Sequence, residues 1–215
     1  MSHLLRIALP DVPGSLGAVA TALGGIGVDI EAIDIVEHRA DGIAIDDFFI
    51  RLRPGVLPDA AVSAVQRLDS VRVMWVSRYP TAGSFHLDLE AVELIAEDPR
   101  RAYQILAELL PRTFRSDWAM VVVRDHGGVH PVHVTPGAPQ VGDSAASWFP
   151  LHDAGRLSAL AGWGSTLLAA APLESGDRLV VFGRRGGPEI LDSELARLGL
   201  LATLAASISQ LPQRR

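Results

Sequence analysis

The chain has 215 residues, which suffices for one large or two small domains. Hydrophobic residues make up 48% and charged residues 20% of it, the balance of a globular protein rather than a disordered one. Its formal net charge of −6 argues against nucleic acid and membrane surfaces as partners. Neither cysteine nor lysine is present, which excludes disulfides, thiol nucleophiles, Schiff bases and a P-loop lysine.

Targeting signals are not apparent in the sequence. Residues 1–6 lack the basic start and apolar core of a signal peptide. The most apolar stretch, 198–208, is shorter than the about 20 residues that span a bilayer. We therefore expect a soluble, cytoplasmic protein.

The first eighty residues alternate between strand and helix patterns. The predicted elements are, in chain order, a strand over 4–9, a helix over 16–26, strands over 28–36 and 43–52, a helix over 61–68 and a strand over 71–75. Asp11 or Ser15 is expected to cap the first helix, and Asp41-Gly42 predicts a hairpin between the second and third strands. The order β-α-β-β-α-β predicts a ferredoxin-like α+β domain.

Three motifs within residues 3–78 resemble those of an ACT domain, a small regulatory domain that often binds amino acids. They are Asp11-Val12-Pro13-Gly14-Ser15-Leu16, then Gly27-Val28-Asp29-Ile30, and Asp46-Asp47-Phe48-Phe49-Ile50. Many ACT domains serve only in dimerisation, so the resemblance leaves open whether this one binds a ligand.

The ACT resemblance implies a site in which the turn before the first helix meets the second strand of a partner domain. The implied ligand-binding residues are Asp11, Val12, Pro13, Gly14, Ser15 and Leu16, with Asp29 and Ile30 opposite. Free N–H groups at the helix start suit a carboxylate, and the acids suit an ammonium group. Amino-acid-binding members often carry Asn where this chain has Asp29, and two acids here would repel a carboxylate.

The remaining residues predict a second mixed domain after a linker over 79–85. The predicted elements are, in order, helices over 87–96 and 102–109, strands over 119–124 and 129–134, a loop over 135–146, a short helix near 157–161, strands over 166–173 and 178–183, and a helix over 195–208. Asp192 or Ser193 is expected to cap the last helix.

The C-terminal half resembles a GAF domain, a sensor fold related to PAS. The resemblance lies in the strand ending Ala171-Pro172-Leu173, the strand 178–183, and Asp192-Ser193-Glu194-Leu195 before an apolar helix. It implies an antiparallel sheet with helices over residues 86–211. The apolar stripe of the last helix is expected either to pair between subunits or to pack on its own sheet.

Metal and catalytic motifs are not apparent in the sequence. His130 and His133 are three apart in a predicted strand and should face opposite sides, while His126 lies in a turn, so we predict no metal site. Asp46 and Asp47 are adjacent in a strand and for the same reason cannot form a catalytic dyad. We predict no cofactor and no catalytic residues.

These patterns predict a non-enzymatic, allosteric regulatory protein that senses a small ligand, an amino acid or a similar amine, through its ACT-like domain at a homodimer interface. The regulatory signal would be transmitted by a change in the assembly of the chain or by a partner protein. One alternative is a structural dimerisation or interaction module without a ligand. Another is an enzyme that uses Asp or His residues of the second half.

Overall fold

The computed structural model describes residues 2–78, 84–174 and 176–211. The chain divides into two compact units, 1–83 and 84–215. The predicted division was a domain over 3–78, a linker over 79–85 and a domain over 86–211. Residues 79–83 of that linker lie outside the described part, and a helix already begins at Ser84.

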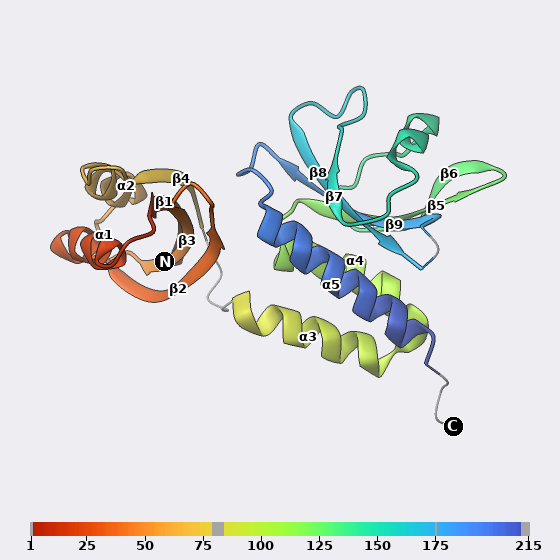
Figure 1. Ribbon diagram of the computed structural model, residues 1–215, viewed down its shortest axis with the longest axis horizontal. Coiled ribbons are helices and arrows are strands. Elements are labelled where there is room, and N and C mark those ends of the chain that lie inside the picture. Colours follow the sequence, from red (N-terminus) through yellow and green to blue (C-terminus); the bar gives the residue numbers. More distant parts are fainter. Residues whose placement is uncertain (1, 79–83, 175, 212–215) are drawn as a thin grey trace. The chain divides into compact units, whose positions relative to one another are not determined.

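The first unit is a four-stranded antiparallel sheet with two helices (Figure 1). Its elements are β1 (Ser2–Pro10), α1 (Ser15–Gly25), β2 (Asp29–His38), β3 (Ile43–Arg51), α2 (Pro58–Gln66) and β4 (Arg72–Arg78). The order along the chain is the predicted β-α-β-β-α-β, and the strands lie in the order β2-β3-β1-β4. The identification of this unit as an ACT domain stays a prediction.

The core of the first unit follows from alternation along its strands. Leu5, Ile7 and Leu9 occupy every second position of β1, so all three point to one face of the sheet. Buried residues of α1 and α2, among them Val19 and Val65, pack against that face. Each helix thus buries one apolar stripe on the sheet.

The second unit has a five-stranded antiparallel sheet in the order β6-β5-β9-β8-β7, with helices against one face (Figure 1). Its elements are α3 (Ser84–Glu97), the 3-10 turn η1 (Pro99–Arg101), α4 (Ala102–Thr113), β5 (Trp118–Asp125), β6 (Gly128–Val134), the 3-10 turn η2 (Asp143–Trp148), β7 (Gly155–Leu157), β8 (Thr166–Leu173), β9 (Arg178–Arg185) and α5 (Asp192–Ser209). The predicted antiparallel sheet with helices is what this unit contains.

Both faces of the second sheet are buried. Ala119 and Val121 of β5 face α4 and α5, whereas Trp118 and Met120 face the connection that contains η2. The rings of Trp118 and Trp163 meet edge to face, with 5.4 Å between their centroids. Tryptophan side chains therefore form part of the core on this second face, together with aliphatic residues.

Three local predictions are wrong. Residues 155–157 form the short strand β7 rather than part of a helix, because they pair with β8. Leu191 caps α5, not Asp192 or Ser193, and its N–H donates to Glu194 Oε2 at 2.9 Å. The N-cap of α1 is Gly14, at φ +97°, with no side-chain hydrogen bond from Asp11 or Ser15.

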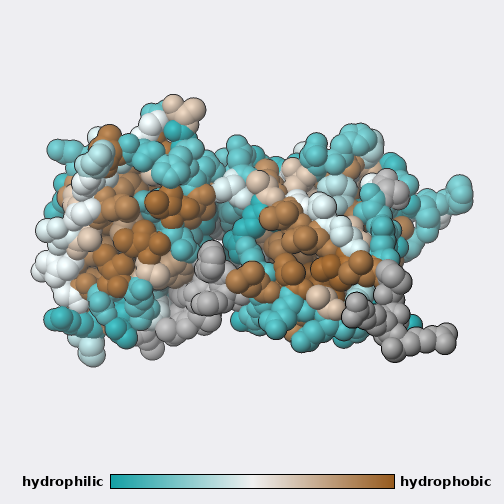
Figure 2. Space-filling view, turned by 60° about the horizontal axis from the view of Figure 1, so that its bottom comes forward, coloured by the Kyte–Doolittle hydropathy of each residue, from teal (hydrophilic) through white to brown (hydrophobic). Residues whose placement is uncertain are grey.

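The apolar stripe of α5 packs on its own unit. Leu198, Leu201 and Ala205 are buried against the sheet and α4. Leu89 and Leu200 are exposed, and Figure 2 shows hydrophobic surface on the helical side of this unit. Within the described ranges, no helix combines the length and apolarity needed to cross a membrane.

Candidate functional site

The predicted binding turn connects β1 to α1. Asp11, Val12, Pro13 and Gly14 are exposed there, and Ser15 and Leu16 are half-buried in the first turn of α1. The positive φ of Gly14 favours glycine, and a Cβ added there would meet nothing within 4 Å. No side chain caps the start of α1, and the Cβ position of Gly14 beside it faces open space.

Asp11 already has a histidine partner in the same unit. Its Oδ2 lies 2.7 Å from Nδ1 of His38, the last residue of β2. The two side chains are 43% and 59% exposed, so a solute can reach the pair. The backbone N–H of Asp11 donates to the carbonyl of Gly42 at 2.8 Å, which ties the turn to the β2–β3 hairpin.

Asp29 is also paired. Arg51 Nη2 donates to Asp29 Oδ2 at 2.5 Å, and Arg51 Nη1 lies 3.5 Å from Glu31 Oε1. The hydrogen bond and the charge of Asp29 raise the pKa of Arg51 above its usual value. The guanidinium of Arg51 therefore offsets part of the repulsion that a carboxylate would meet at Asp29, although Glu31 shares the same guanidinium. Ile30 is half-buried and packs against the core.

Strand register separates Asp11 from Asp29. Asp29 is opposite Arg51 at one end of β3, whereas His38 is opposite Ala44 at the other end. Because β2 has 10 residues, the two ends are roughly 30 Å apart. One copy of the chain therefore does not bring the two halves of the predicted site together.

A buried acid, Asp46, was not among the predicted site residues. It is 1% exposed, and its Oδ1 has no hydrogen-bond partner in the described part of the chain. Burial raises its pKa to about 6, the charges of Asp11 and Asp47 act in the same direction, and His38 lowers it. Asp47 points to the opposite face of the sheet, as expected for the next residue of a strand. Its carboxylate accepts hydrogen bonds from Nε and Nη2 of Arg6 at 2.8 and 2.9 Å.

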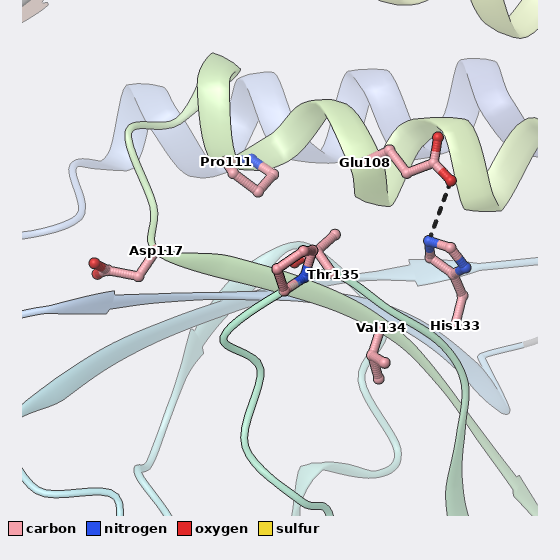
Figure 3. A pocket seen from close by; sticks show the side chains of 7 residues that line it. Glu108, Pro111, Asp117, His133, Val134 and Thr135 are labelled. Carbon is pink, nitrogen blue, oxygen red and sulfur yellow. Dashed lines mark ion pairs between the residues drawn. The ribbon is translucent and has the colours of Figure 1, made fainter.

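The second unit contains a surface pocket of about 390 Å³ between α4 and the β5–β6 edge (Figure 3). Glu108 of α4 and His133 of β6 point toward each other, with 3.5 Å between Oε1 and Nε2, while Asp117 points away. The hydroxyl of Thr135 is engaged with the backbone of Ala119. The Glu108–His133 pair is therefore the main polar feature of this pocket.

The expectation that His130 and His133 face opposite sides is wrong. A register shift between them places His130 opposite Val123 and His133 opposite Val121, which share one face of β5. His130 Nε2 is 3.7 Å from Asp125 Oδ2, and His126 lies in the turn. Across residues 2–78, 84–174 and 176–211, no group of three or more His, Cys, Asp and Glu side chains is arranged to hold a metal ion.

Comparisons give no family for the chain: no family model and no curated protein matches it. Several solved structures are similar. Free methionine-R-sulfoxide reductase from Neisseria meningitidis is 13% identical, covering 62% of this chain and 94% of its own, with a TM-score of 0.46. The GAF domain of Acinetobacter phosphoenolpyruvate-protein phosphotransferase is 10% identical, covering 57% and 92%, with a TM-score of 0.42. The chromophore-binding domain of a bacteriophytochrome from R. palustris is 10% identical, covering 96% and 92%, with a TM-score of 0.47. At this level of similarity, no residue role passes from these proteins to this one.

Proposed function

We propose that this chain is a non-enzymatic regulatory protein, and that its first unit is an ACT-like domain that binds an amino acid or a similar amine between two copies. The observation that supports this role best is the pair of exposed ion pairs at opposite ends of one sheet. Asp11–His38 can receive an ammonium group, and Asp29–Arg51 can receive a carboxylate.

A zwitterionic ligand needs both charges within a few ångströms. Because register keeps Asp11 and Asp29 at opposite ends of the sheet, the proposed site needs the turn of one copy beside β2 of a second. A ligand bound there favours the dimer over the separated chains. The size of that shift equals the difference in its affinity for the two states.

The second unit is proposed to be a GAF-like domain that supplies dimerisation or a second ligand site. Its antiparallel sheet with three helices over one face is the architecture that the resemblance implies. The 390 Å³ pocket at Glu108 and His133 is a candidate site for a small polar ligand. Output would then pass through assembly or through a partner protein.

One observation favours the alternative of an interaction module without a ligand. Asp11 pairs with His38 and Asp29 pairs with Arg51 in their own unit, so each acid already has a hydrogen-bond partner without a ligand. In that case the turn and β2 would serve in assembly alone.

Thermal unfolding of the full chain against the twenty amino acids distinguishes the two roles. A ligand at 100 times its Kd stabilises the folded state by about 2.7 kcal/mol, and about 2–4 °C per kcal/mol is expected for a chain of this size. Asp11→Asn and Arg51→Gln should each remove the shift. Asp177→Asn is the matched control, since it removes an exposed acid paired with Arg124 in the other unit. No shift with any amino acid would favour the interaction module.

A further inference from the structure

Asp46 projects from the face of the first sheet that carries the core. It lies opposite Ile7 of β1 and Ile35 of β2, and Ile7 belongs to the core beneath α1 and α2. Phe48, two residues further along β3, points the same way and is also in that core. A carboxyl group thus occupies a position where the surrounding pattern calls for an apolar side chain.

One oxygen of this carboxyl, Oδ1, is buried and lacks a hydrogen-bond partner within the described part of the chain. With a pKa of about 6, roughly nine in ten molecules carry the charge at pH 7. A buried, ionised carboxylate without a partner costs several kcal/mol, and such groups concentrate at functional sites.

The Asp11–His38 pair lies near Asp46, and the charges of both residues act on the pKa of its carboxyl. His38 is opposite Ala44, two residues before Asp46 on β3, so both side chains leave the same face of the sheet. Asp11 is held beside His38 by their 2.7 Å contact, and both side chains are about half exposed. A small cation that separates this pair therefore meets one carboxylate at the surface and a second one below it.

We propose that Asp46 and Asp11 together bind the primary ammonium group of the ligand, with His38 released from Asp11 as the ammonium enters. This inference rests on the proposed function and assigns the charged end of its ligand. An ammonium group has three N–H donors, enough for Oδ1 of Asp46 and a carboxylate oxygen of Asp11. A metal ion fits less well, because Asp11, His38 and Asp46 are not arranged as a three-ligand metal site in the described part of the chain.

The site predicts a pH dependence of binding. The charged groups that face Asp46 are His38 and Asp11 on its own side and Asp47 behind it, whose charge Arg6 balances. Binding needs Asp46 ionised, so affinity should fall about tenfold between pH 7 and pH 5 as its carboxyl takes up a proton.

Two measurements on the full chain test the site. The first is calorimetric titration with each amino acid that stabilises the protein and with its N-acetyl derivative, which lacks the ammonium group. We expect the derivative not to bind, and Asp46→Asn to raise the Kd of the free amino acid at least tenfold. Asp177→Asn is again the control and should leave the Kd unchanged.

The second measurement needs no variant and no amino acid. The carboxyl carbon of Asp46 is titrated by NMR with and without methylammonium, and bound methylammonium should lower the pKa of Asp46. If methylammonium lowers the pKa of Asp46 but no amino acid binds, the ammonium site at Asp46 is supported and the proposed amino-acid sensing is refuted. If amino acids bind equally well to Asp46→Asn and methylammonium leaves the pKa unchanged, the assignment of Asp46 is overturned while the proposed function survives.

Discussion

Replacing Asp46 by asparagine should stabilise the first unit, increasingly so as the pH rises. The pKa of this carboxyl rises from 3.8 to about 6 on folding, so the folded state holds its proton more tightly than the unfolded state. Between those two values the folded state therefore loses stability as pH increases. A shift of about two units corresponds to about 3 kcal/mol, complete above pH 7 and absent below pH 4.

Calorimetric unfolding of the wild type and of Asp46→Asn from pH 4 to pH 8 measures this effect. The informative quantity is the change in their difference with pH, because the introduced amide also needs hydrogen bonds. Asp47→Asn is the contrasting control: it leaves Arg6 buried without its 2.8 Å partner and should destabilise by about 3 kcal/mol. A difference between wild type and Asp46→Asn that stays constant from pH 4 to pH 8 would refute the reasoning.

Two further predictions concern the second unit. In urea unfolding, Gly183→Ala should destabilise this unit by about 3 kcal/mol, because the new Cβ would lie 2.1 Å from the ring of Trp118. Gly142→Ala is the control: it has open space around it and should change stability by less than about 0.5 kcal/mol. Glu194→Gln should cost about 3 kcal/mol in the same assay, because it removes the charge 2.8 Å from the buried guanidinium of Arg184. A loss no larger than that of an exposed ion pair, about 1 kcal/mol or less, would contradict this account of the Arg184–Glu194 pair.

Most helices and strands of this protein could be predicted from the sequence alone. A short apolar run over 4–9 marks β1, and apolar residues at helical spacing mark α5. The order of elements in the first unit could be predicted from these patterns in the sequence. The turn at Asp11–Gly14 was also predictable, since proline and glycine limit the backbone there.

Short-range patterns failed where distant pairing decides the local structure. The three residues of β7 adopt a strand because they pair with β8. Their own strand propensities give no information about that pairing. The cap of α5 likewise depends on the carboxylate of Glu194 reaching back to Leu191. In each case a hydrogen bond outweighs a weak local preference.

The charges of the candidate site were decided by tertiary structure. The sequence placed Asp11 in an exposed turn and Asp29 at the start of a strand, and both positions agree with the structure. The antiparallel register then brings Arg51 to Asp29 and puts His38 beside Asp11, while it holds the two acids at opposite ends of the sheet. Asp46 is buried only because β1, β2 and the helices close over it, and that enclosure, rather than the residue type, raises its pKa.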